Sequence, residues 1–290
     1  MALAMAAMML GLGGCAVQDG AYRKDVDAWH AQRIERLKSD TGWLTLVGLH
    51  KLGQGAHTVG SASGSDISIE GAPAPRIGTL EVVGNSVTFV ADRLATVEHD
   101  GQRILREQMT TDAEGAPTVL VAGGVRFYVI DRGGDLYLRV KDEHATTLTT
   151  FKGIDRYPVE DRWRVQARLL PGTASKIGVP NVLGQVEASD SPGVLAFELA
   201  GQACQLAPTL NSDGSLFFVF GDPTNGAGTY PAGRFLDADA ISDDGTVMLD
   251  FNRATNPMCA FTAYATCPLP PDGNTLAIPV EAGEKYPLPH

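Results

Sequence analysis

The chain lacks the features of proteins that bind nucleic acid or cross membranes. Lys and Arg number 23 against 34 Asp and Glu, so the formal net charge is −11. This shortage of basic residues disfavours nucleic acid and anionic membrane surfaces as partners. After the first residues, no apolar run approaches the length of a membrane-spanning helix. At 290 residues the chain can bury a large core without disulfides, as one large domain or two smaller ones.

Familiar catalytic signatures are also missing. The sequence contains no GxSxG nucleophile elbow, no HExxH zinc motif and no glycine-rich phosphate loop, and the glycines from Gly221 to Gly228 match neither the Walker nor the Rossmann spacing. A serine or cysteine nucleophile would need a histidine partner. Apart from His290, the histidines lie in the N-terminal half, where His50, His57, His99 and His144 are interpreted as solvated or core-edge residues. We predict no cofactor and no metal site.

Cysteine is scarce, and the first of the 4 cysteines follows an apolar run. The residues Leu12-Gly13-Gly14 before Cys15 are typical of a bacterial lipoprotein signal, in which Cys15 becomes the lipidated first residue. No Lys or Arg precedes the run, a departure that leaves open a start upstream of Met1; the alternative is an ordinary buried N-terminal segment. We predict a signal peptide over 1–14, a tether over 15–22, and a lipid anchor on a membrane of the cell envelope, facing the periplasm or the exterior.

The remaining cysteines bear on the redox state of an exported protein. In an oxidising compartment, Cys259 and Cys267 are close enough in sequence to pair, which leaves Cys204 free. A zinc site would need shorter spacing between the cysteines and a nearby histidine. The sequence therefore predicts a disulfide between Cys259 and Cys267.

The hydrophobic pattern predicts one helix followed by many strands. Residues 24–37 place Val26, Trp29 and Leu37 near one helical face. Short alternating segments then follow one another, separated by turn signals. The predicted turns are Gly84-Asn85, Asp100-Gly101, Gly123-Gly124, Gly133-Gly134, Ser191-Pro192-Gly193 and Asn211-Ser212-Asp213-Gly214. We predict an all-β fold with one N-terminal helix, an antiparallel barrel or sandwich of many strands.

Domain organisation is less sharply marked. The stretch from Pro171 to Pro180 is rich in proline, glycine and small residues, and could form a hinge between two halves. The C-terminal half alone would lack a helix or a tryptophan for its core. We therefore predict a single β-rich domain over 23–290.

Polar side chains are densest between residues 217 and 286. A long irregular segment inside a domain is usually functional or disordered, and the apolar residues Phe251, Phe261 and Leu276 argue against disorder. The sequence therefore predicts a site here. The candidate ligand-binding residues are Asp222, Thr224, Tyr230, Arg234, Asp250, Asn252, Arg253, Asn256, Asn274, Glu281 and Glu284.

Four motifs together resemble a known family. They are GWL.L.GL at 42–49, F.G...YPVED.WRV.A at 151–167, D.TNG..TY..GR.L at 222–236, and DFN.A.NP.CAFT.YATCPLPP..N.L..P..AGEKY at 250–286. In this combination the chain resembles the bacterial family called domain of unknown function 1684, over roughly Trp29 to Tyr286. The resemblance implies kinship and no particular activity, so function has to be argued from the residues.

The leading hypothesis is binding of a small polar or anionic ligand by a lipid-anchored envelope protein. Loops stiffened by proline could close one end of the sheets into a pocket, and the planar fork of Arg234 or Arg253 suits a carboxylate or phosphate.

Two alternatives remain open. In a hydrolase, two of the four carboxylates Asp222, Asp250, Glu281 and Glu284 would act as acid and base. In a purely structural protein, Asp250 would pair with Arg253, Glu281 or Glu284 would pair with Arg234, and the asparagines would cap turns. The sequence does not decide between enzyme and binding protein, and it identifies neither the ligand nor the oligomeric state.

Overall fold

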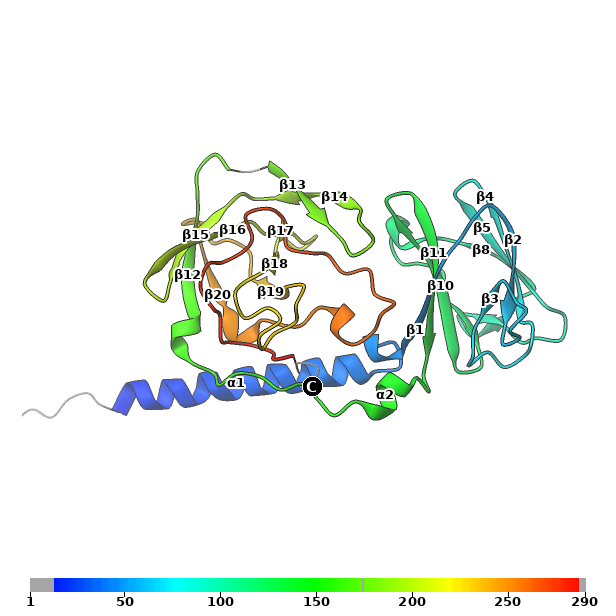
Figure 1. Cartoon of the computed structure of the whole chain (residues 1–290), viewed down its shortest axis with the longest axis horizontal. Coiled ribbons are helices and arrows are strands. Elements are labelled where there is room, and N and C mark those ends of the chain that lie inside the picture. The colour runs from blue at the N-terminus through cyan, green and yellow to red at the C-terminus, as the bar shows by residue number, and fades with distance from the viewer. Residues whose placement is uncertain (1–12, 174, 287–290) are drawn as a thin grey trace, which may run out of the picture.

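A computed structural model describes residues 13–173 and 175–286, with side chains from residue 20 onward (Figure 1). The predicted signal peptide therefore lies almost entirely outside the described residues. The strands form two bodies: the N-terminal body, residues 46–142, and the C-terminal body, residues 164–286. The predicted fold class is confirmed, because the described residues form open, mainly antiparallel sheets and one long N-terminal helix.

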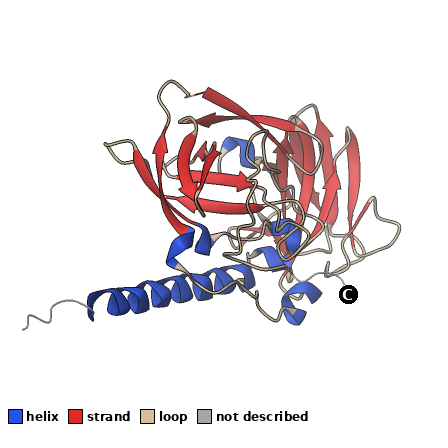
Figure 2. Cartoon of the chain, turned by 60° about the vertical axis from the view of Figure 1, so that its left-hand side comes forward, coloured by secondary structure: helices blue, strands red, loops and turns tan. Residues whose placement is uncertain are grey.

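The N-terminal body is a sandwich of two sheets (Figure 2). Its first sheet has the order β1 (Leu46–Lys51), β11 (Asp135–Asp142), β10 (Val125–Arg132), β9 (Leu120–Ala122), β6 (Glu98–His99), β7 (Gln102–Arg103). Its second sheet has the order β3 (Ile67–Ser68), β2 (Gly55–Gly60), β4 (Gly78–Val83), β5 (Ser86–Ala91), β8 (Arg106–Met109). Phe89 and Phe127 meet between the sheets with ring centroids 5.2 Å apart.

Local sequence explains these strands well. In β10, Phe127 and Val129 are buried while Arg126 and Tyr128 are partly exposed, the alternation of a sheet with one covered face. The Gly84-Asn85 turn joins β4 to β5, and Gly84 has φ of 58°, which a side chain would make unfavourable. The turns predicted at Asp100-Gly101, Gly123-Gly124 and Gly133-Gly134 also join paired strands.

The C-terminal body contains three smaller sheets. The first has the order β16 (Gln202–Leu206), β15 (Leu195–Leu199), β12 (Arg164–Leu169), β20 (Thr246–Asp250). The second has the order β17 (Thr209–Leu210), β18 (Leu216–Phe220), β19 (Arg234–Ala238), and β13 (Ser175–Pro180) pairs with β14 (Val186–Ser191). Phe251, just after β20, packs its ring against Phe197 and Phe220, which joins the first two sheets in one core.

Two strand pairings expected across the predicted turns are wrong. Residues 175–180 form strand β13, and β14 pairs with β13 rather than with β15 across Ser191-Pro192-Gly193. The turn at 211–214 is correct, but it joins β18 to β17 rather than to β16. Pro208 lies between β16 and β17 and has no N–H for a ladder, so it separates them. Alternation marks a strand, but it does not identify the partner strand.

Helix α1 (Gly13–Lys38) lies along the C-terminal body (Figure 1). It begins before the predicted Lys24 and so includes the residues 15–22 predicted to be a tether. Its buried face carries Val26, His30, Arg33 and Leu37, which follow helical spacing. The helix ends at Lys38, and the chain turns past it at Gly42, where an added Cβ would come within 2.2 Å of the Leu37 carbonyl oxygen.

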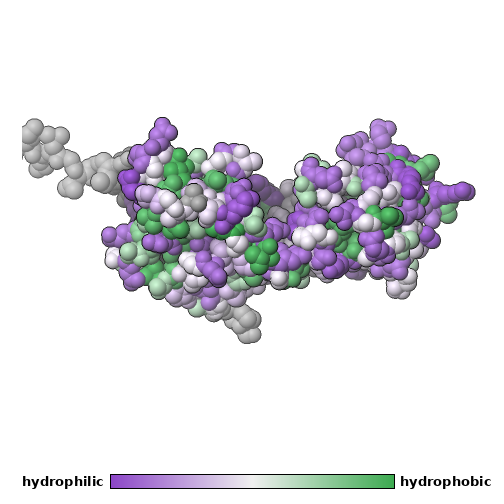
Figure 3. All heavy atoms as spheres, turned by 90° about the horizontal axis from the view of Figure 1, so that it is seen from above, coloured by the Kyte–Doolittle hydropathy of each residue, from purple (hydrophilic) through white to green (hydrophobic). Residues whose placement is uncertain are grey.

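The two bodies meet in a small apolar cluster. Leu46 of β1 packs there with Val219, Phe235, Ala265 and Cys267 of the C-terminal body. On the face seen in Figure 3, the molecule is hollowed between the two bodies. Short helices occupy the connections: α2 (Thr146–Thr150), and 3₁₀ turns at Trp43–Thr45, Asp112–Glu114, Asp161–Trp163, Phe251–Arg253 and Met258–Ala260. That residues 23–290 form one domain stays a prediction.

Candidate functional site

The first cluster of predicted site residues is a fully buried ion pair. Arg234 Nη2 lies 2.7 Å from Asp222 Oδ2, and both side chains are 0% exposed. The same guanidinium donates to the carbonyl oxygens of Val280 at 2.8 Å and Ala282 at 2.5 Å. Asp222 Oδ1 accepts the backbone N–H groups of Thr224 and Val280. The pair therefore ties the loop after β18 to the C-terminal tail.

The second cluster joins the tail to helix α1. Both carboxylate oxygens of Glu284 accept hydrogen bonds from Arg33, through Nε and through Nη2 at 3.1 Å. Asn256 N donates to Glu284 Oε2 at 2.7 Å, and its carbonyl accepts from Arg33 at 2.9 Å. His30 Nε2 lies 4.0 Å from Glu284 Oε1, and burial lowers the pKa of His30. The buried carboxylate of Glu284 therefore holds helix α1 against the C-terminal tail.

The third cluster lies where α1 passes the end of β20. Tyr22 donates to Asp250 Oδ1 at 2.7 Å, and Asn252 Nδ2 donates to the Tyr22 oxygen at 2.9 Å. Burial, and then the hydrogen bond to Asp250, raise the pKa of Tyr22. Arg253 lies 3.3 Å from Asp250 and 2.5 Å from Asp25 of the helix. This cluster is half-buried and holds the helix from its N-terminal side.

The other predicted residues have separate surroundings. Asn274 is buried and exchanges two hydrogen bonds with the backbone of Ala207, each 2.8 Å long. Thr224 shares a 2.8 Å hydrogen bond with the hydroxyl of Thr229. The ring of Tyr230 stands edge-on to that of Tyr286, with centroids 5.1 Å apart. Glu281 is exposed.

These contacts bear on each sequence hypothesis. The alternative of internal ion pairs correctly named Asp250 with Arg253, but it named the wrong partner for Arg234, which pairs with Asp222. Both arginines offered for an anionic ligand are already paired with carboxylates of the chain. Among the carboxylates offered as an acid and base pair, Asp222, Asp250 and Glu284 each face an arginine of their own.

The cysteines are arranged as predicted. Cys259 and Cys267 are at disulfide-bonding distance with their Cα atoms 6.2 Å apart, and Cys204 is free and buried. In an oxidised protein the bond closes the loop that carries Tyr264 and Thr266. Burial raises the pKa of the Cys204 thiol.

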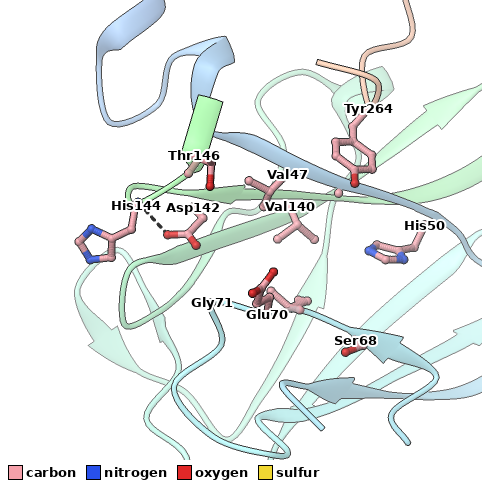
Figure 4. Close-up of a pocket in the computed structure, with 13 residues that line it drawn as sticks. Val47, His50, Ser68, Glu70, Gly71, Val140, Asp142, His144, Thr146 and Tyr264 are labelled. Carbon is pink, nitrogen blue, oxygen red and sulfur yellow. Dashed lines mark hydrogen bonds between the residues drawn. The ribbon is translucent and has the colours of Figure 1, made fainter. Parts of the chain in front are cut away.

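A cavity of about 440 Å³ lies away from these clusters, at the side of the N-terminal body (Figure 4). Strands β1 and β11, the residues after β3 and the start of α2 form most of its wall, and Tyr264 reaches it from the C-terminal body. Its lining is Val47, Gly48, His50, Ser68, Ile69, Glu70, Gly71, Val140, Asp142, His144, Ala145, Thr146 and Tyr264. The cavity is therefore built from both bodies.

Negative and neutral polar groups dominate this cavity. Figure 4 shows the Glu70 carboxylate, the His50 ring and the Tyr264 hydroxyl turned toward the same space. Asp142 Oδ1 accepts the backbone N–H of His144 at 2.8 Å, which fixes its carboxylate in the wall. Burial lowers the pKa of His50, so its imidazole is neutral near pH 7.

Glycines keep part of the cavity open. A Cβ on Gly71 would come within 2.3 Å of the Asp142 carboxylate, and one on Gly48 within 2.9 Å of the His50 ring. Larger residues at these positions would push both side chains out of place. The sequence does not predict this site, because its groups come from segments more than two hundred residues apart and the pattern indicates that His50 and His144 are solvated or core-edge residues.

The architecture and the contacts define a mostly β protein of two bodies, in which the C-terminal body holds the N-terminal helix through buried polar groups. Residues 149–285 match the family model described as Protein of unknown function (DUF1684). The motif at 42–49 lies outside the matched residues.

Among solved structures, the chain is similar to the solution NMR structure of an uncharacterized protein of Haloarcula marismortui. The two are 28% identical, with a TM-score of 0.41, over 49% of this chain and 80% of that one. No curated protein matches the chain.

Within residues 13–173 and 175–286, no helix is both long and apolar enough to span a membrane. In the same part of the chain, no group of three His, Cys, Asp or Glu side chains is placed to hold a metal ion.

Proposed function

We propose that the protein is a lipid-anchored envelope protein that binds a small, polar, positively charged or neutral ligand in the cavity of Figure 4. The observation that carries this proposal is the convergence of Glu70, Asp142 and His50 with the Tyr264 hydroxyl in one space of about 440 Å³. That volume lies within the range of small-molecule sites, and such sites orient ligands with a few convergent polar groups.

The charges of the lining favour a cation over an anion. The cavity is lined by two carboxylates, and no Arg or Lys side chain lines it. An amine or guanidinium could donate to Glu70 and Asp142 in charge-assisted hydrogen bonds, while the hydroxyls of Ser68 and Thr146 could receive or give further bonds. This shifts the predicted ligand from a polar or anionic compound bound by Arg234 or Arg253 to a polar or cationic one.

The polar residues between 217 and 286 have a structural role in this proposal. Their buried ion pairs and asparagine contacts hold α1 and the tail against the sheets. Catalysis is not part of the proposal, since the paired carboxylates face arginines rather than one another.

The binding proposal predicts that amines or guanidines raise the melting temperature of the unlipidated C15S protein. Glu70→Gln should weaken the affinity for such a compound about tenfold or more, because a hydrogen bond to a charged group is worth about 1.5–3 kcal/mol. The measurement is a thermal-shift screen of amines, guanidines, neutral sugars and small carboxylates, followed by calorimetric titration.

Glu114→Gln is the matched control, since Glu114 is exposed and lies outside the cavity lining. Its affinity should equal that of the parent. Two results would contradict the proposal. One is stabilisation by carboxylates alone, and the other is equal affinity of the Glu70→Gln and parent proteins for the amine that stabilises the parent most.

The anchor proposal rests on Leu12-Gly13-Gly14-Cys15. Figure 1 supports it, because the N-terminal end of α1 extends beyond the sheets and would space the body from a membrane surface. Cys15→Ser should abolish metabolic lipid labelling and move the protein from the membrane fraction to the soluble fraction. Unchanged fractionation of this variant would show that the anchor assignment is wrong.

A further inference from the structure

Arg139 is a buried cation with no carboxylate partner in the described part of the chain. It projects from β11 toward the C-terminal body and is 4% exposed. Its Nη2 donates to Thr266 Oγ1 at 3.2 Å, and its buried Nε has no hydrogen-bond partner. Charged side chains are rarely buried unless they are paired, because removing the charge from water is costly.

A second arginine points at the same hydroxyl. Arg132 Nε donates to Thr266 Oγ1 at 3.3 Å, and Arg132 is itself paired with Asp112 at 2.8 Å. Two guanidinium groups therefore converge on one neutral oxygen atom. An anionic oxygen would be the better acceptor at this point, since hydrogen bonds between charged groups are roughly twice as strong as neutral ones.

The surroundings of Arg139 add positive charge. Its guanidinium lies over the rings of Trp43 at 5.2 Å and Tyr128 at 5.9 Å, and Lys141 Nζ lies 5.5 Å from the centre of the Trp43 ring. Burial lowers the pKa of Lys141 to about 8, and the charge of Arg139 acts in the same direction. Stacking on the rings holds Arg139 in place, but it does not neutralise the charge.

A cavity of about 400 Å³ opens beside these groups. Arg132 and Thr266 line it, together with Asn181, Thr209 and residues of β13, β14 and β18. The hydroxyl of Ser189 also lines the cavity. Glu187 contributes a carboxylate to the lining, and its side chain is exposed. Arg139 is not part of this lining and is linked to it through the Thr266 hydroxyl. A small ion entering from solvent can therefore reach Arg132 and the Thr266 hydroxyl on which the two arginines converge.

We propose that this cavity between the two bodies binds an oxyanion, a carboxylate or a phosphate group. The anion lies beside Thr266, accepts hydrogen bonds from Arg132 and from the Thr266 hydroxyl, and balances the charge of Arg139, which contacts the same hydroxyl. Because β10 and β11 contribute the arginines and the loop of the C-terminal body contributes Thr266, the bound anion joins the two bodies. The site is separate from the cavity of Figure 4 and has the opposite charge preference.

The test is a thermal-shift titration of the full C15S chain with sodium phosphate and with sodium succinate, each against sodium chloride at matched ionic strength. The parent should show a saturable rise, about 5 °C at about 100 times the Kd, with the oxyanions only. Comparing the rise in melting temperature with phosphate and with succinate shows whether the site prefers a phosphate or a carboxylate group. Calorimetric titration of the same protein gives the Kd without relying on unfolding.

Arg132→Gln should weaken oxyanion binding at least about thirtyfold, and Arg139→Gln and Thr266→Val should weaken it less. Arg106→Gln is the control, since Arg106 is exposed and paired with Glu81. If Arg139→Gln does not fold, Arg132→Gln tests the same site. Equal stabilisation of the parent by all three salts, or unchanged oxyanion affinity in the arginine variants, would overturn the proposal and leave Arg139 as a cation held by stacking and by its hydrogen bond to Thr266.

Discussion

Replacing Arg234 with methionine is expected to lower the free energy of unfolding by about 3–5 kcal/mol. The variant leaves the Asp222 carboxylate in a site where both side chains are 0% exposed, without its counter-charge. It also removes the donors to the carbonyl oxygens of Val280 and Ala282. Urea unfolding followed by circular dichroism measures the loss as a lower midpoint at an unchanged slope.

A double variant separates the charge from the packing. In Arg234→Met with Asp222→Leu, neither member of the pair is left as an unpaired buried charge, and the part of the lost stability that comes from the unpaired carboxylate should return. Lys176→Met is the surface control, since its pair with Asp190 is exposed and should contribute at most about 1 kcal/mol. A loss below about 1 kcal/mol in Arg234→Met would contradict the structural role assigned to the pair.

Much of the fold could be predicted because local signals carry it. Glycine turns and alternation located β4 and β5, and the meander β9 to β11, since two-residue turns bring consecutive strands together. Pairings without a short turn could not be predicted. Strand β12 lies between β15 and β20, whose partners are set by packing over long sequence distances.

The candidate site shows where sequence reasoning ends. Density of polar residues predicted a ligand site in 217–286, but density alone does not distinguish ligand contacts from internal pairs. The deciding partners, Tyr22 and Arg33, lie on a helix more than two hundred residues away, and no local pattern connects them to Asp250 or Glu284. The cavity of Figure 4 could not be predicted from local patterns for the same reason, because its walls come from both bodies.

Arg33→Met is expected to cost about 3–5 kcal/mol and to loosen α1 from the C-terminal body. Glu284 is 1% exposed, and Arg33 supplies both of its side-chain hydrogen bonds from the helix. Without that partner the carboxylate has to reach water, which it can do most easily if the helix moves away. Hydrogen exchange measures this directly, as faster exchange of the amides between residues 24 and 38.

The alternative outcome is that the apolar contacts of Val26 and Leu37 hold α1 without the ion pair. In that case Arg33→Met would unfold at lower urea while its helix amides keep their protection relative to the rest of the protein. Lys38→Met, which removes an exposed pair with Glu35 on the same helix, gives the reference for a surface change. Because the tail that carries Glu284 also receives the hydrogen bonds of Arg234, release of α1 should be accompanied by faster exchange at Val280, whose amide donates to Asp222. Protection of Val280 equal to that of the Lys38→Met protein would mean that the helix and the tail are held independently.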